Sequence, residues 1–290
     1  MFMKLIQKKT SPGQSLPISI TYKDTKTQNI ELPHHIHDWN EIIYVYKGKG
    51  TLLIDQNLYQ ATPGDLFVIP SNVVHRAIPA SDHLITSTAV FFHSSLLHLP
   101  ENIYTSTKHA IIHLARSEKT YRFQIHKDGH DDIESYLDRI HDEIQLVTKE
   151  SERAIFLWLQ LLLVYLDRHC VISSFTPKST GEPEWMRSLL QYIESHLHEK
   201  LDLNDLATRS SISTAHLSRV FKKYLGIGLS EYITTKRMAN AKQELLHSNE
   251  NIETIAEACG FSSMPHFYRT FKKHTQLTPS DYRKAGTYGR

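Results

Sequence analysis

Two histidines and a glutamate near the N-terminus have the residue types and the spacing of metal ligands. His35 and His37 stand one residue apart, and Glu41 follows four residues later. Side chains two apart on a β-strand point to the same face, so these groups can converge on one point. Such a set, with open coordination positions, could bind a divalent ion and activate oxygen or hold a substrate.

The segment that carries these residues is predicted to be β-structure. Residues 18–92 contain short apolar runs such as "EIIYVYKGKGTLLID", and turn signals such as Pro63-Gly64 separate them. Short strands at close spacing are typical of a barrel or sandwich. We therefore expect residues 1–130 to form a β-barrel domain that surrounds the histidines.

The hydrophobic period changes after the β-rich segment. Ile133, Leu137 and Ile140 recur at steps of three and four, which predicts an amphipathic helix, and the apolar stretch "SERAIFLWLQLLLVYLDRH" predicts a second one. The apolar faces of these helices could pack against the barrel or against a second subunit. We predict that residues 131–172 form a helical hairpin that mediates homodimerisation. Residues 173–184, "SSFTPKSTGEPE", have the composition of a linker.

Residues 185–290 are predicted to be helical, and they contain an internal repeat of about 50 residues. The stretch "LSRVFKKYLGIGLSEYI" aligns with "FYRTFKKHTQLTPSDYR", and "LNDLATRSSIS" aligns with "IETIAEACGFS" if one residue of slip is allowed. In the second copy, Asn251 can cap a short helix, Gly260 can end it, and Ser262 or Ser263 can cap the next helix. Two helices joined by a tight turn form a helix-turn-helix unit.

The second helix of each unit is predicted to have a basic outer face. Phe267 and Phe271 lie four residues apart and face inward, which leaves polar and basic groups outside. Arginine can make two hydrogen bonds to guanine, and lysine can bind phosphate. Residues 185–290 carry 15 Lys or Arg and 10 Asp or Glu. A merely solvated surface would explain the basic residues of one copy, but it would not explain why both copies carry Arg and Lys-Lys at the same positions. The predicted DNA-binding residues are His216, Ser218, Arg219, Lys222, Lys223, His266, Tyr268, Arg269, Lys272 and Lys273.

The stretch "IAEACGFSSMPHFYRTFKKHTQLTPSDYR" closely resembles the signature of AraC/XylS transcription regulators, and the resemblance covers residues 185–285. It implies an all-α domain of seven helices whose two helix-turn-helix units enter successive major grooves of promoter DNA. It adds Ala215 and Pro265 to the base-contacting positions. It also implies an activator that works with RNA polymerase. One departure is Gln276, which stands where the family usually has glycine, whereas Gly226 keeps that glycine in the first copy.

The N-terminal motif is similar to that of the cupins, whose metal-binding members hold iron, manganese or another divalent ion at the positions of His35, His37, Glu41 and His75. Many sugar-responsive AraC-type regulators carry a barrel of this kind as a sensor. We favour a pocket for a small ligand, expected to be a carbohydrate, without a cofactor or catalytic residues. The expected ligand-binding residues are His35, His37, Trp39, Glu41, Tyr44 and His75. A divalent metal site and a purely structural role for the histidines are the alternatives.

The composition places the chain among globular proteins, with 40% hydrophobic and 22% charged residues. It has no apolar run of the ~18 residues that a membrane span needs and no signal-peptide core, so we expect a cytoplasmic protein. Cys170 and Cys259 are then expected to stay reduced. No phosphate-binding loop, dinucleotide motif or nucleophile elbow occurs. The sequence therefore predicts an α+β multidomain regulator and not an enzyme. The alternative is a metal-dependent cupin isomerase or dioxygenase with a DNA-binding appendage.

Overall fold

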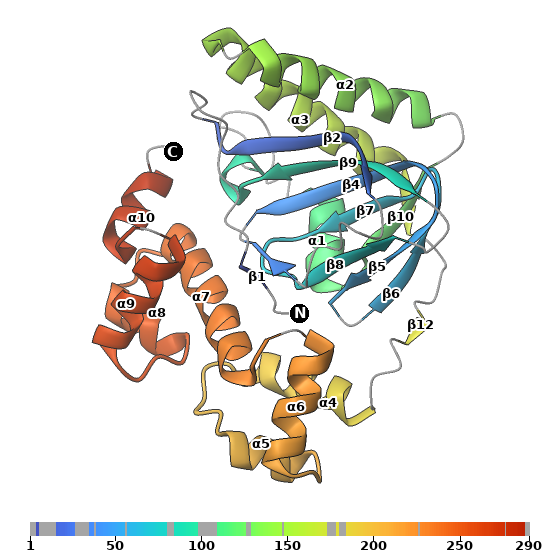
Figure 1. Ribbon diagram of the computed structural model, residues 1–290. Coiled ribbons are helices and arrows are strands. Elements are labelled where there is room, and N and C mark those ends of the chain that lie inside the picture. Colours follow the sequence, from blue (N-terminus) through green and yellow to red (C-terminus); the bar gives the residue numbers. More distant parts are fainter. Residues whose placement is uncertain are drawn as a thin grey trace. The chain divides into compact units, whose positions relative to one another are not determined.

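The computed structural model divides the chain into two compact units, residues 4–180 and residues 181–290 (Figure 1). The division falls within the segment that the sequence predicts to be a linker. The structure describes residues 4–5, 16–26, 35–37, 39–55, 57–79, 84–97, 109–125, 129–146, 148–172, 178–179, 184–225, 227–275 and 277–287. Among these residues, no helix combines the length and the apolar character needed to cross a membrane.

The first unit contains two six-stranded sheets, which confirms the cupin-like β domain. The strand order of one sheet is β1 (Lys4–Leu5), β3 (His35–Ile36), β8 (His75–Pro79), β5 (Gly50–Ile54), β6 (Asn57–Ala61) and β12 (Lys178–Ser179). The order of the other is β11 (Cys170–Ile172), β10 (Arg122–Ile125), β7 (Leu66–Ile69), β4 (Asn40–Lys47), β9 (Ile85–Phe92) and β2 (Ile18–Lys26). Only β1 and β3 pair in parallel among the described strands.

The second sheet is covered by helices (Figure 1). Helices α2 (His130–Leu146) and α3 (Lys149–His169) pack against each other, and their buried residues join one apolar core with β4, β7 and β9. A shorter helix, α1 (Ala110–Ser117), packs against β7 and α3. Strand β4 is therefore buried along almost its whole length, on both faces. The two predicted helices are present, but the apolar face that begins at Ile133 packs inside the chain and is not left exposed for a partner.

Two strands lie where the sequence predicts other structure. Residues Cys170–Ile172, expected to end the helical hairpin, form β11 and pair with β10. Residues Lys178–Ser179, expected to be linker, form β12 and pair with β6. Without β11 and β12, β10 and β6 would be the edge strands of their sheets. An edge strand has unpaired N–H and C=O groups, and any extended segment that reaches it can pair with them. Most other residues of the predicted linker lie outside the described residues.

The second unit is helical in its described residues and contains the two predicted helix-turn-helix units. Asn251 accepts a hydrogen bond from the Thr254 amide at 2.6 Å and so caps the first helix of the second helix-turn-helix unit, as predicted. Ser263 caps the next helix. The predicted departure at Gln276, and Gly226, lie outside the described residues. The helices are α4 (Glu184–Ser195), α5 (Leu203–Arg209), α6 (Thr214–Leu225), α7 (Leu229–His247), α8 (Ile252–Ala258), α9 (Met264–Thr275) and α10 (Pro279–Thr287).

The one-residue slip between the repeats lies in the turn of the second unit. Ser211 and Gly260 occupy the same left-handed position after the first helix, with φ of 55° and 85°. The capping residues that follow are Ser213 and Ser263, so Ser262 is the additional residue. A glycine takes the left-handed conformation without steric cost, whereas the Cβ of a serine disfavours it.

Gly260 is predicted to be indispensable to the second helix-turn-helix unit. A Cβ on this residue would lie 2.2 Å from Leu197 O and 2.8 Å from Arg237 Nε, in addition to its positive φ. We expect Gly260→Ala to cost more than about 1 kcal/mol of local stability, measured by hydrogen exchange of α8 and α9 amides in the full chain. The control is Gly228→Ala, where φ is −71° and a Cβ would meet nothing within 4 Å. Equal exchange rates in the two variants would contradict the prediction.

Candidate functional site

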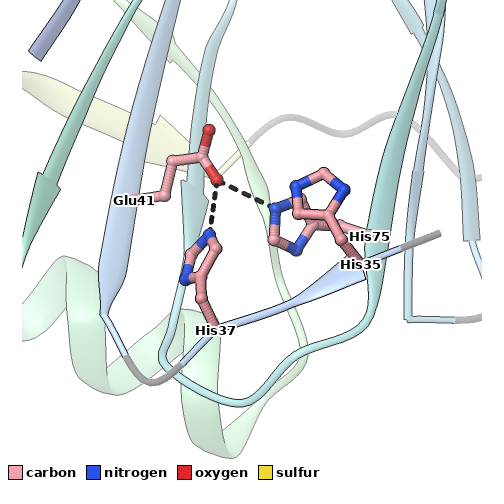
Figure 2. A group of neighbouring side chains, drawn as sticks. All are labelled: His35, His37, Glu41 and His75. Carbon is pink, nitrogen blue, oxygen red and sulfur yellow. Dashed lines mark hydrogen bonds and ion pairs between the residues drawn. The ribbon is translucent and has the colours of Figure 1, made fainter. Parts of the chain in front are cut away.

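Four buried side chains meet between the two sheets, as the sequence predicts for His35, His37, Glu41 and His75. His35 on β3 and His75 on β8 are direct cross-strand partners, and their rings lie 4.1 Å apart. His37 follows β3, and Glu41 reaches the group from β4 in the other sheet. One potential ligand atom from each residue lies within 4.8 Å of the other three. We call this group, shown in Figure 2, the His/Glu cluster.

Backbone carbonyls fix the orientation of two imidazoles in the His/Glu cluster. His37 Nδ1 donates a hydrogen bond to Trp39 O at 2.8 Å, and His75 Nδ1 donates to Val73 O at 2.9 Å. A neutral imidazole that carries its proton on Nδ1 presents a lone pair on Nε2. The Nε2 atoms of His37 and His75 lie 3.1 and 2.9 Å from the same oxygen, Glu41 Oε2 (Figure 2).

The Glu41 carboxylate is buried and ionised. Burial by itself raises the pKa of Glu41, but the neighbouring His75 and His37 outweigh it and hold that pKa well below the ordinary value. His75 Nε2 is buried and faces Glu41 Oε2 at 2.9 Å. The buried Glu41 carboxylate faces the Nε2 atoms of two imidazoles. Positive charge between the carboxylate and these nitrogens stabilises it, and either protons on the imidazoles or a bound cation can supply that charge.

The residues of the His/Glu cluster fit a divalent metal ion. Three imidazoles and one carboxylate form a donor set that suits first-row transition metals. The hydrogen bonds from Nδ1 of His37 and His75 to carbonyls are of the kind that orients metal-binding histidines in proteins. The Nε2 atoms of His37 and His75 both face Glu41 Oε2, so one cation could be shared by the two imidazoles and the carboxylate.

The structure separates Tyr44 from the His/Glu cluster, with which the sequence groups it in the expected ligand pocket. Side chains alternate along a strand, so Tyr44 and Glu41, three residues apart on β4, face opposite sides of the sheet. The Tyr44 hydroxyl donates to Glu134 Oε1 at 3.1 Å and lies 3.1 Å from His130 Nδ1, both on α2. Trp39 stays near the cluster through its carbonyl, but its ring is buried in the apolar core.

Two contributors to the site have no signal in the sequence. The carbonyl groups that orient His37 and His75 belong to Trp39 and Val73, and any residue type could supply them. The ring of Phe91 meets His37 edge to face, with 5.6 Å between the ring centres. Phe91 lies on β9 and pairs with Glu41, 50 positions earlier in the chain, so only the register of the sheet reveals the contact.

The predicted DNA-binding residues all lie on two recognition helices, α6 and α9. Each helix buries two side chains completely, Leu217 and Phe221 on α6 and Phe267 and Phe271 on α9. The opposite faces are exposed, except that His216 is half-buried with its ring 6.3 Å from that of Trp185. These faces carry Ala215, His216, Ser218, Arg219, Lys222 and Lys223 on α6, and Pro265, His266, Tyr268, Arg269, Lys272 and Lys273 on α9.

The fold and these two sites define a protein that joins a cupin-like domain with a buried polar cluster to a duplicated helix-turn-helix domain. Comparison with protein families agrees with this description. An AraC-like ligand binding domain matches residues 17–162, and a helix-turn-helix domain matches residues 206–285. The chain belongs to the AraC family of transcription regulators.

Several known proteins are similar to this chain. An uncharacterized HTH-type transcriptional regulator of Staphylococcus aureus is 28% identical over 247 residues, which are 83% of this chain and 31% of that protein. The regulatory protein PocR of Salmonella typhimurium is 38% identical over 99 residues, 34% of this chain and 33% of that protein. The chain thus spans about a third of the length of these curated relatives. The DNA-binding domain of AdpA, solved in complex with a target DNA, is 26% identical, with 37% of this chain and 97% of that chain covered and a TM-score of 0.36.

Proposed function

We propose that this protein is an effector-responsive transcription activator that binds promoter DNA through α6 and α9. The observation that carries the proposal is the match between the two recognition helices. Each buries two apolar side chains completely and exposes an arginine and a lysine pair at the same register, Arg219 with Lys222 and Lys223 on α6. Basic groups on such a face supply base contacts and phosphate contacts to duplex DNA. The activating role follows the family resemblance and requires contact with RNA polymerase.

The arginines and the lysines of the recognition helices are expected to act differently on DNA. Arg269→Ala should lower discrimination at its own base pair by ~1–3 kcal/mol, because arginine reads a guanine edge. Lys272→Ala should weaken binding evenly across sequences and lower the salt slope by about one, because lysine neutralises a phosphate. Fluorescence anisotropy with duplexes selected from a random library by the wild-type protein measures both effects at several salt concentrations.

The control for these variants is Arg187→Ala, which removes an exposed arginine of α4, outside the recognition helices. It should leave discrimination between base pairs unchanged. Unaltered discrimination in Arg219→Ala and Arg269→Ala together would show that α6 and α9 are not the recognition helices. A reporter gene placed behind the selected duplex should rise in expression when the protein is present, and a fall would contradict activation.

The effector site is proposed to be the His/Glu cluster loaded with a divalent metal ion. When bound, such an ion supplies a positive centre with open positions for oxygen ligands. The hydroxyl groups of a carbohydrate suit those positions, so a small sugar stays the proposed effector. The chain's own contribution is to hold the carboxylate of Glu41 and the imidazoles of His37 and His75 in a fixed, buried arrangement. The same residues would suit an isomerase or dioxygenase, but membership of the AraC family favours sensing over catalysis.

Metal binding by the His/Glu cluster can be tested with cobalt(II) as the probe. We expect the chelator-treated protein to bind one equivalent with the visible absorption of a cobalt–imidazole complex, and His75→Ala to lose at least about tenfold in affinity because it removes a ligand. His113→Ala, which changes an exposed histidine of α1, and Tyr44→Phe should bind as the wild type does. Equal cobalt affinity in His75→Ala and His113→Ala would exclude the cluster as the metal site.

An exposed apolar stripe on α3 supports homodimerisation. Leu157 and Leu161 are 59% and 46% exposed although both are large apolar residues. They belong to a row with alternating steps of three and four, which is the spacing of a coiled-coil seam. The row begins with Glu150 and ends with Arg168, both exposed. We call this row the α3 seam; its members are Glu150, Ala154, Leu157, Leu161, Val164 and Arg168.

The α3 seam is self-complementary about Leu159. In an antiparallel pair centred there, Leu157 faces Leu161 of the partner subunit, and Glu150 faces Arg168 of the partner subunit. A two-fold axis requires this reciprocity, in which the same residues meet from both sides. A second copy of this chain therefore satisfies both the apolar centre and the charged ends of the seam, which lies within the segment 131–172 that is predicted to mediate homodimerisation.

The double variant Leu157→Glu, Leu161→Glu is expected to be monomeric while the wild type is dimeric, because four carboxylates would face each other in two pairs across the axis. Sedimentation equilibrium gives the mass of each. The control is Leu84→Glu, which changes a leucine that is 56% exposed on the β domain and should leave the mass unchanged. A wild-type monomer, or a double variant of unchanged mass, would contradict the role of the α3 seam.

A further inference from the structure

Helix α7 carries both helix-turn-helix units. Its Tyr232 packs edge to face against Phe221 of α6, with ring centres 5.5 Å apart. Its C-terminal half supplies Met238, Ala241 and Leu245 to the core that also contains Phe267 and Phe271 of α9. Figure 1 shows α7 running from the group of α4, α5 and α6 to the group of α8, α9 and α10. Each recognition helix is therefore attached to a different half of the same helix.

Side chains in the middle of α7 hold the end of α4 and the connection that follows it. Lys236 Nζ lies 2.9 Å from Glu194 Oε1, which also accepts a hydrogen bond from the Tyr232 hydroxyl at 3.2 Å. The next residue, Arg237, donates from Nε to Leu197 O at 2.8 Å and from Nη2 to Glu199 O. The two carbonyls belong to the connection between α4 and α5, so Arg237 ties α7 to the first helix-turn-helix unit.

The turn of the second unit lies against the same arginine. Gly260 leaves α8 in the left-handed conformation, and a Cβ there would lie 2.2 Å from Leu197 O and 2.8 Å from Arg237 Nε. The backbone of the second unit thus touches both the carbonyl that Arg237 binds and its guanidinium group. Arg237, Leu197 and Gly260 form a junction between the two units that lies beside the axis of α7.

We propose that Arg237 is a positioning residue that fixes the orientation of α6 relative to α9. It thereby sets the spacing that the protein accepts between the two DNA boxes, by which we mean the two short base sequences contacted by α6 and by α9. The inference rests on the proposed DNA binding. A continuous helix fixes the separation of the groups it carries, but contacts beside its axis are needed to resist bending and rotation about it. Arg237 makes such contacts with one unit through two hydrogen bonds and with the other through close packing.

The spacing of the boxes is a sensitive measure of this orientation. Each base pair inserted between two boxes moves the second box by about 3.4 Å and turns it by about 34° around the duplex. A rigid pair of recognition helices cannot follow both displacements, so one of them loses its base contacts. A loosened pair can follow them at the cost of a lower affinity for the parent spacing.

The test compares the full-length wild type with Arg237→Ala on one duplex selected by the wild type from a random library, and on derivatives with one base pair inserted or deleted between the boxes. For the wild type we expect a loss of affinity on the order of tenfold per inserted base pair, by fluorescence anisotropy at fixed salt. For Arg237→Ala we expect the ratio between parent and inserted duplex to fall toward one. Duplexes with either box scrambled should bind both proteins equally.

The matched control is Arg283→Ala, which removes a hydrogen bond from an arginine to the Glu250 carbonyl that lies entirely within the second unit. It should keep the wild-type ratio. Arg237→Gln, which retains one donor group, should give an intermediate ratio and serves if Arg237→Ala fails to fold. A wild-type ratio in both Arg237 variants, or a selected duplex with a single box, would overturn the inference alone. A wild type that selects no duplex would overturn the proposed function.

Discussion

The β domain depends on the accommodation of one buried charge, the carboxylate of Glu41. At 4% exposure, an isolated carboxylate would cost several kcal/mol in lost hydration. Its compensation comes from the other sheet, where His35 and His75 are paired across β3 and β8 and His37 follows directly. The carbonyls of the neighbouring loops hold two of these rings so that their Nε2 atoms face the carboxylate. The packing of the two sheets and the chemistry of the site are therefore one constraint, because neither sheet alone supplies both the charge and the groups that stabilise it.

Strand β4 connects this interior to the outer layer of helices. Glu41 points into the domain, and Tyr44, on the opposite face of the same strand, forms a hydrogen bond with Glu134 of α2. Helix α2 packs in turn on α3, whose exposed face carries the α3 seam. The proposed effector site and the proposed subunit contact thus lie on the two sides of one strand and its helical cover. A ligand changes the balance between conformations only through a difference in its affinity for them, and this chain of contacts provides a physical connection for such a difference.

The DNA-binding unit is organised differently from the β domain, because its two short repeats pack on one long helix, α7. Each recognition helix buries a pair of side chains completely and so leaves its other face free for polar and basic groups. Units of this size do not bury enough apolar surface alone, and α7 completes both cores. The sequence repeat thus produces two equivalent basic surfaces, while the contacts of Arg237 and Gly260, which have no counterpart in the repeat pattern, hold the two halves of the unit together.

Local patterns in the sequence determined the β-rich character of residues 18–92, the amphipathic helices, the cap at Asn251 and the two helix-turn-helix units, because each depends on residues fewer than about ten positions apart. They also indicated that His35, His37 and Glu41 could converge, but the pairing of β3 with β8 and the packing of the two sheets bring His75 and Glu41 to the other two histidines. Only the tertiary structure decided that Tyr44 faces α2, that Cys170–Ile172 join a sheet, and which stripe of α3 is covered. Helix α3 is apolar on most faces, so its periodicity fits more than one orientation. The choice among orientations, like the junction at Arg237, is made by packing between segments far apart in the chain, and no short stretch of sequence encodes it.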